Sequence, residues 1–195
     1  ESILQLTERI GEIPLPPYIH RDPNNTNKSL DIQRYQTVYA NPEKKVAVAA
    51  PTAGLHFTPA ILDLLEKTKI KSYDLTLHIG LDTFRPITTG MIEDHVIHKE
   101  FYEIPAATCS AIHSTPKGSR LAVGTTSLRT LEDYSLKVKD SNNNLSSSKG
   151  DFCSKADIFI YPPATFSTTD LLLTNFHLPR STLFCLVAAF LTPGE

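Results

Sequence analysis

The apolar positions of the chain alternate between short runs of buried-strand length and longer stretches with helical spacing. The short runs predict strands near residues 46–50, 72–79, 120–123 and 157–161. The longer stretches predict helices near residues 1–11, 59–68, 125–134 and 180–191, the second of them behind Thr58 as N-cap and Pro59 as first helical residue. Because strands and helices alternate over short connections, the pattern predicts an α/β fold, a layered α/β/α domain with a parallel or mixed sheet.

Polar and proline-rich segments separate these elements. The prolines at 14–17 favour an extended connection, and the Asn-rich residues 22–31 predict a loop. Residues 139–150 contain Ser-Asn-Asn-Asn and Ser-Ser-Ser, which cannot bury enough apolar surface to become ordered. We therefore expect a mobile surface loop there.

Composition limits the class of protein. The hydrophobic fraction of 41% and charged fraction of 21% over 195 residues are ordinary for one soluble globular domain. No apolar run approaches the roughly 20 residues that cross a bilayer, and no signal peptide pattern opens the chain, so we expect a cytoplasmic protein without a membrane partner. The three cysteines, Cys109, Cys153 and Cys185, are odd in number and far apart, which favours reduced structural thiols.

Two segments place chemically useful side chains where a predicted strand runs into a predicted helix. Residues 50–58 carry Thr52, Gly54 and His56, and residues 174–182 carry Asn175, His177, Arg180 and Ser181. In open α/β sheets, ligands bind at the carboxyl ends of the strands. Both segments are therefore candidates for a binding or catalytic site.

Histidine is the main chemical signal, because imidazole is well suited to moving protons near neutral pH. Five of the seven histidines fall within motif blocks: His56, His78, His95, His98 and His177. A hydrogen-bonded structural histidine is the alternative for each, although their positions at loop edges favour function. His95, His98 and Glu100 also suggest a metal-dependent hydrolase, but the histidines are three apart, whereas the zincin motif needs four, so no metal is expected.

Anion binding is a further possibility. Residues 124–127 and 180–182 lie at predicted helix starts. The free backbone N–H groups there either bind an anion or are capped by a nearby side chain. The formal net charge is −2, yet residues 20–45 collect basic side chains that form either a local phosphate-binding patch or a solvated face. Four aromatic residues are candidates for stacking on a base, with the core as alternative: Tyr18, Tyr35, Tyr39 and Phe57.

Taken together, the motifs resemble one family. The blocks that carry the resemblance lie at residues 14–19, 34–40, 50–58, 77–80, 83–84, 95–100, 122–129 and 174–182. In this order, across nearly all of residues 10–190, the chain is similar to the S-adenosylmethionine:tRNA ribosyltransferase-isomerases of queuosine biosynthesis.

The resemblance implies an activity. The family transfers and isomerises the ribosyl part of S-adenosylmethionine onto 7-aminomethyl-7-deazaguanine at the tRNA wobble position. Adenine and methionine leave, and epoxyqueuosine remains. S-adenosylmethionine is a co-substrate, no true cofactor or metal is implied, tRNA is the partner, and a monomer is favoured.

The resemblance also implies site residues. His56 or His177 is expected to be the base, with other side chains lining the site or assisting proton transfer: His78, His95, His98 and Glu100. The residues expected to bind S-adenosylmethionine are Thr52, Gly54, Gly124, Thr125, Thr126, Asn175 and Ser181. The residues expected to contact tRNA are Arg21, Arg34, Tyr35, Gln36, Arg129 and Arg180.

The chain departs from the family in extent and at a few positions. Family members are longer at both ends and carry a small β-barrel domain, so residues 1–195 are expected to be a partial catalytic domain without that barrel. A non-catalytic tRNA-binding module of the same family is the alternative. Leu81 and Asp82, and also Pro163, stand where the family has small residues or glycine, which suggests reshaped loops.

Overall fold

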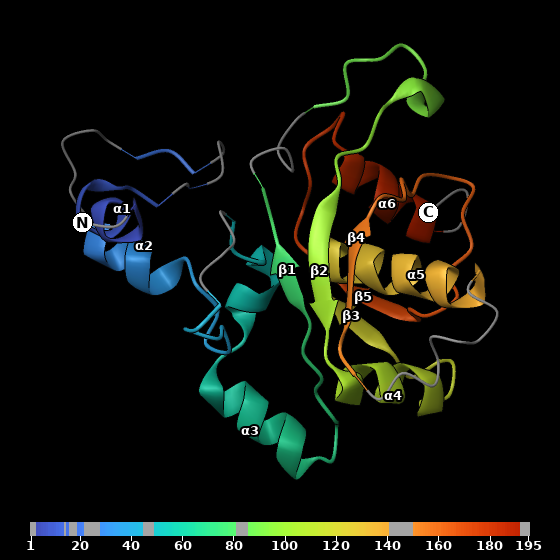
Figure 1. The fold of residues 1–195 in the computed structure, drawn as a ribbon, viewed down its shortest axis with the longest axis horizontal. Coiled ribbons are helices and arrows are strands. Elements are labelled where there is room, and N and C mark those ends of the chain that lie inside the picture. The colour runs from blue at the N-terminus through green and yellow to red at the C-terminus, as the bar shows by residue number, and fades with distance from the viewer. Residues whose placement is uncertain are drawn as a thin grey trace.

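A computed structural model describes residues 3–13, 15, 19–21, 28–44, 49–80, 86–140 and 150–191 (Figure 1). The α-helices are α1 (Ile3–Ile10), α2 (Lys28–Arg34), α3 (Pro59–Lys67), α4 (Ala106–Ser114), α5 (Thr125–Asp140) and α6 (Thr182–Phe190). Two short 3₁₀ helices are η1 (Thr52–His56) and η3 (Ile92–Asp94). The strands are β1 (Thr76–His78), β2 (Glu100–Ile104), β3 (Leu121–Val123), β4 (Phe152–Ala156) and β5 (Leu171–Leu173).

The strands in the described ranges form two sheets. One is antiparallel with the order β1-β2-β4, and the other pairs β3 with β5 in parallel. Helices and strands are mixed along the chain, which confirms the predicted α/β class. The parallel pairing that the sequence favoured is confined to β3 and β5.

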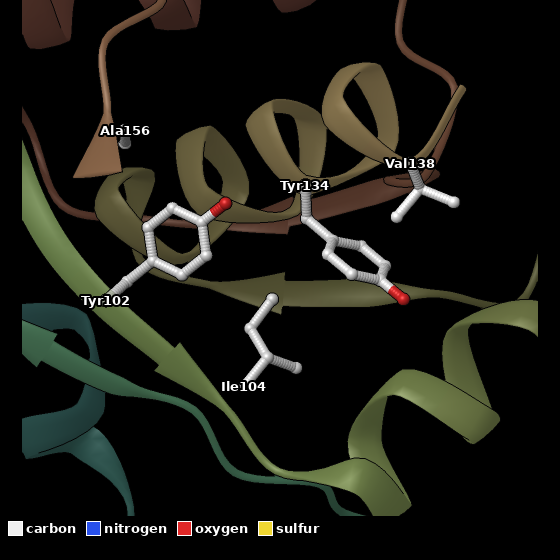
Figure 2. Close-up of a cluster of buried hydrophobic side chains, with 5 residues drawn as sticks. All are labelled: Tyr102, Ile104, Tyr134, Val138 and Ala156. Atoms are coloured by element: carbon white, nitrogen blue, oxygen red, sulfur yellow. The ribbon is translucent and has the colours of Figure 1, made fainter. Parts of the chain in front are cut away.

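Helix α5 joins the two sheets, because it packs against β3, β4 and β5 and also against α6. One buried cluster comprises Tyr102, Ile104, Tyr134, Val138 and Ala156. Figure 2 shows the β2 side chains of this cluster pointing toward those of α5. A second cluster comprises Ala122, Leu128, Ile160, Leu186 and Ala189. Because α5 is buried against both clusters, its position is fixed, and so is the position of residues 124–126 at its amino-terminal end.

Two helices begin at side chains that cap their first turns. The Thr58 side chain accepts a hydrogen bond from the N–H of Ile61, and the Ser181 hydroxyl accepts one from Phe184. Such caps satisfy backbone donors that the first turn leaves free. The predicted helices at 59–68 and 180–191 are thereby confirmed as α3 and α6.

Helix α5 is longer than the predicted 125–134. Val138 extends its buried face, and the Lys137 ammonium lies 2.7 Å from the Asp133 carboxylate one turn earlier. Asp133 is itself fully buried and accepts a hydrogen bond from the Tyr102 hydroxyl at 2.8 Å. The additional turn is stabilised by this packing rather than by helix propensity.

The predicted strand at 157–161 is wrong. Strand β4 ends at Ala156, and beyond it side chains of α5 take the place of a neighbouring strand. Arg129 donates to the carbonyl oxygens of Ala156 and Ile158, and Asp133 accepts from the N–H of Asp157. These three backbone groups are bonded to side chains of α5 instead of to a neighbouring strand.

Other predictions fall partly or wholly outside the described residues. These are the prolines at 14, 16 and 17, Tyr18, residues 45–48 of the first predicted strand, residues 81–85, and most of the predicted mobile loop, residues 141–149. Ala49 and Ala50 belong to no strand, and the end of the predicted loop at 22–31 is helical in α2. Within the described ranges, no helix is long and apolar enough to cross a membrane.

Candidate functional site

The carboxyl ends of β3 and β5 bring two of the motif segments together. Val123 and Leu173 are opposite one another at the ends of these parallel strands. The chain then continues into residues 124–126 on one side and 174–177 on the other. The N–H of Gly124 donates to the Leu173 carbonyl oxygen at 2.8 Å, with Gly124 at φ +94°, a conformation that glycine adopts without strain.

A third segment reaches the same edge through His56. Its Nε2 atom lies 2.9 Å from Asn175 Oδ1, and because an amide oxygen only accepts, the ring nitrogen is the donor. Neighbouring Gly54 packs tightly, since a Cβ there would lie 2.0 Å from the Tyr39 hydroxyl oxygen and 2.8 Å from a Thr37 methyl carbon. Packing of residues 37–39 thus accounts for the glycine.

His177 is held within its own loop. Its Nε2 atom lies 2.8 Å from the Thr174 hydroxyl, and burial lowers the pKa of the imidazole below its ordinary value. A neutral ring at physiological pH is available as a hydrogen-bond partner or a base. Phe176, between His177 and Asn175, is fully exposed.

Thr52, Thr125 and Ser181 occupy the starts of three helical elements. Thr52 is the first residue of η1, Thr125 is the buried first residue of α5, and the Ser181 hydroxyl caps α6. Of the two alternatives for residues 180–182, anion binding and helix capping, the structure shows capping by Ser181.

A buried ion pair lies at the start of β2. Glu100 accepts from Arg129 Nη1 at 3.0 Å, and its other carboxylate oxygen lies 3.0 Å from His98 Nε2. Burial lowers the pKa of the Arg129 guanidinium, and the Glu100 and Asp133 carboxylates oppose that shift. The Glu100 charge therefore compensates much of the cost of placing the guanidinium away from water.

The tRNA contact predicted for Arg129 does not agree with the structure. Only 7% of its side chain is exposed, and its donors are occupied by Glu100 and by the carbonyl oxygens of His98, Ala156 and Ile158. A guanidinium in this position cannot reach a phosphate. The sequence could not reveal this, because Glu100 is 29 positions away.

One cavity adjoins this ion pair, and a groove lies next to that cavity. A small pocket of about 20 Å³, room for about one water molecule, is lined by His98, Glu100, Thr126, Arg129 and Thr182 together with apolar side chains. An open groove of about 730 Å³ is lined by residues 158–167 and by side chains of α5. Residues 158–160 line both. The groove has the size of a small-molecule site.

Glu132 fixes one wall of the groove. Its carboxylate accepts hydrogen bonds from the backbone N–H groups of Ser167, Thr168 and Thr169 at 2.8–2.9 Å. Sequence reasoning missed this residue, because nothing in a helical glutamate indicates a partner more than 30 positions away. Thr174 and Thr182 were also missed, although both lie in the 174–182 block.

Two predicted histidines lie elsewhere. His78 Nε2 is 2.9 Å from Glu103, which also pairs with Lys44, and hydrogen bonds from Lys44 and then His78 lower the pKa of the Glu103 carboxyl. His95 packs edge-on against Phe159 at a centroid distance of 5.4 Å. Throughout the described part of the chain, no three His, Cys, Asp or Glu residues group closely enough to hold a metal ion. The hydrolase hypothesis thus has no ligand set there.

The remaining residues predicted to bind tRNA differ in exposure. Arg34 and Arg180 are exposed, Arg180 with φ at 61° and its carbonyl oxygen accepting from the N–H of Ile87. Arg21 pairs with Asp31 at 2.7 Å, and the Gln36 side chain accepts from the N–H of Thr37. Tyr35 is buried, so the stacking predicted for its ring does not agree with the structure.

The fold and site define an α/β protein with polar, histidine-bearing loops gathered where two parallel strands end. Comparison with known proteins gives the family. The chain matches the model of the family described as queuosine biosynthesis protein over residues 1–194, and it belongs to that family.

Named relatives agree with this assignment. The S-adenosylmethionine:tRNA ribosyltransferase-isomerase of Trichlorobacter lovleyi is 48% identical over 192 residues, covering 97% of this chain and 51% of that protein. The protein of the same name from Thermotoga maritima is 44% identical over 182 residues, covering 92% and 49%. The chain thus spans about half the length of the curated relatives it matches.

A solved structure is also similar. The crystal structure of S-adenosylmethionine tRNA ribosyltransferase from Thermotoga maritima is 40% identical, with a TM-score of 0.50. The match covers 71% of this chain and 41% of that chain.

Proposed function

We propose that this chain is part of an enzyme that transfers the ribosyl moiety of S-adenosylmethionine to tRNA and isomerises it. The acceptor is 7-aminomethyl-7-deazaguanine at the wobble position, and the products are epoxyqueuosine-tRNA, adenine and methionine. One observation carries the proposal: residues 52–56, 124–126 and 174–177 meet at the β3–β5 edge through the Gly124–Leu173 and His56–Asn175 hydrogen bonds.

The chemistry accounts for histidines without a protein nucleophile. The sulfonium acidifies the adjacent 5′ methylene, so the reaction needs a base for that proton and an acid that assists the departure of adenine. The aminomethyl group of the modified base is itself the nucleophile. His56 and His177 are the sequence-based candidates for the base, and His177 has the lowered pKa that keeps an imidazole neutral.

The two substrates are assigned to different groups of residues. The amino-terminal end of α5, at Gly124–Thr126, suits the methionine carboxylate, with Thr52, Asn175 and Ser181 nearby in the proposed complex. Arg34 and Arg180 are exposed and suit tRNA phosphates, with Arg21 and Gln36 as further contacts. No true cofactor is required by this chemistry. We place the activity in the cytoplasm, in a monomer whose described residues belong to a larger layered α/β/α catalytic domain.

A second candidate is a tRNA-binding module of the same family that catalyses no reaction. The observation that favours it is the exposure of Arg34 and Arg180, which suits phosphate contacts whether or not the chain catalyses a reaction. Such a module would bind tRNA and release no adenine.

One assay separates the two candidates. The chain is incubated with S-adenosylmethionine and tRNA bearing 7-aminomethyl-7-deazaguanine, and mass spectrometry measures free adenine and epoxyqueuosine in the digested tRNA. The Thermotoga maritima relative serves as positive control. Both products establish the transferase. If the control forms both and the chain forms neither, the transferase proposal is wrong for this chain, and retarded migration of tRNA in a native gel then supports the binding module.

A further inference from the structure

The five motif histidines differ sharply in what their ring nitrogens contact. His56 contacts an amide, His177 a hydroxyl, and His78 a half-exposed carboxylate shared with Lys44. His95 has an aromatic ring as neighbour. Among the described residues, only His98 contacts a buried carboxylate that is itself held by a buried cation.

From this arrangement we infer that His98 is the proton-transfer residue of the reaction, and that Glu100 and Arg129 are positioning residues that act through it. The inference rests on the proposed function and deepens it by naming the base. It replaces the sequence-based choice of His56 or His177.

A proton-transfer residue must be more exposed to the substrate than the residues that position it. Glu100 and Arg129 are 4% and 7% exposed at their side chains, whereas His98 is 18% exposed. The imidazole is therefore the member of the set that a substrate can reach. His98 also lines the small pocket together with Thr126, which follows the β3 end at the proposed substrate edge.

Glu100 determines which ring nitrogen is free. Paired with Arg129, its carboxylate is ionised and only accepts, so His98 Nε2 is the donor. Neutral His98 then carries its proton on Nε2 and its lone pair on Nδ1. No hydrogen-bond partner of Nδ1 occurs within the described ranges, and that atom is available to a substrate.

Arg129 fixes both ends of this unit. One terminal nitrogen binds Glu100, and the other binds the carbonyl oxygens of His98 and Ala156. The planar guanidinium thus holds the side chain of Glu100 and the backbone of His98 in a single geometry. A lysine, with one nitrogen, cannot make these contacts simultaneously.

The proton step balances without another reactant. The 5′ C–H bond next to the sulfonium breaks, its electron pair stays on carbon, and the proton forms an N–H bond at His98 Nδ1. The imidazolium is stabilised by Glu100. When the bond between adenine and ribose C1′ breaks, its electron pair goes to the adenine nitrogen, and the Nδ1 proton passes to the leaving adenine, which returns the ring to the neutral form.

The test compares adenine release by the wild-type chain with three variants. His98→Ala is expected to lower kcat by about 10²- to 10⁴-fold with little change in KM, the range for loss of a general acid–base. Added imidazole is expected to restore part of the rate, since the deleted side chain leaves space for it. Glu100→Gln and Arg129→Lys are expected to lower kcat while imidazole rescues neither. His113→Gln, which replaces an exposed histidine on α4 outside the site, is the matched control.

A spectroscopic measurement adds a readout independent of turnover. Nitrogen-15 spectra of the histidine rings above neutral pH are expected to show His98 protonated at Nε2, with a mixture of tautomers in Glu100→Gln. A wild-type chain that forms products while His98→Ala forms them equally fast overturns the inference, as does an Nδ1-protonated His98. A wild-type chain without products overturns the proposed function instead.

Discussion

His56 and Asn175 are 119 positions apart in the sequence, and their side chains meet at 2.9 Å. The contact closes one edge of the site, because Asn175 follows β5 directly and His56 ends η1. Substitution of either partner by alanine is expected to weaken S-adenosylmethionine binding or turnover. The free-energy loss of the double variant should be smaller than the sum of the two single losses. The difference is expected to be about 0.5–1.5 kcal/mol, the net contribution of one hydrogen bond. A double-mutant cycle on kcat/KM measures this coupling, and strict additivity would contradict it.

His177 makes folding stability depend on pH. Burial lowers its pKa in the folded chain, so as pH falls through about 6.5 the unfolded chain takes up the proton first. Stability contributed by the neutral ring is full above that pH and is lost below it, until the folded-state pKa is passed. Urea unfolding between about pH 8 and pH 5 is expected to show a smaller loss in His177→Gln than in the wild type. Identical pH profiles for the two proteins would refute this assignment.

Gly124 links β3 to α5 at a φ of +94°. A Cβ at this position has ample space, since its nearest neighbour would be Ser127 Oγ at 3.9 Å. The expected cost of Gly124→Ala is therefore conformational and amounts to about 1–3 kcal/mol. Gly90→Ala is the matched control, because Gly90 has open space and no positive φ. Urea titration of both variants checks the difference, and equal stability would contradict the strain argument.

Arg180 offers an exposed cation at the start of α6, whereas Arg129 is buried. Arg180→Ala is expected to weaken tRNA binding at low salt and to reduce the slope of log affinity against log salt by about 1. Lys117→Ala, which removes an exposed cation elsewhere, is the control. An unchanged slope in Arg180→Ala would remove this arginine from the tRNA contact.

Local signals allowed much of the fold to be predicted, and long-range pairing explains the rest. Thr58 and Ser181 cap helices within three residues of themselves, so the sequence reveals both helix starts. The unpaired segment after Ala156 depends instead on Arg129, which is 27 and 29 positions away from the carbonyl groups it binds. An interior strand and a segment satisfied by a buried arginine have the same apolar pattern.

The same distinction applies to the candidate site. The loops at 50–58 and 174–182 were recognised because their residue types suit a strand edge. Their contact through His56 and Asn175 emerges only when β3 and β5 are paired. Arg129 resembled a phosphate ligand because it lies in the first turns of a helix, and only its burial beside Glu100 excludes that contact.

Gly54 and Tyr39 provide a test of how two motif blocks are packed. A methyl group at residue 54 would lie 2.0 Å from the Tyr39 hydroxyl oxygen and 2.9 Å from the ring carbon that carries it. Gly54→Ala is expected to destabilise the chain by about 1–3 kcal/mol, the usual cost of overpacking. Tyr39→Phe removes the closest atom but leaves the ring, so the double variant should recover part of that loss. Urea unfolding of the two single variants and the double variant measures the recovery. If Tyr39→Phe gives no relief in the Gly54→Ala background, the hydroxyl is not the atom that the methyl group meets, and the contact between residues 37–39 and η1 has a different geometry.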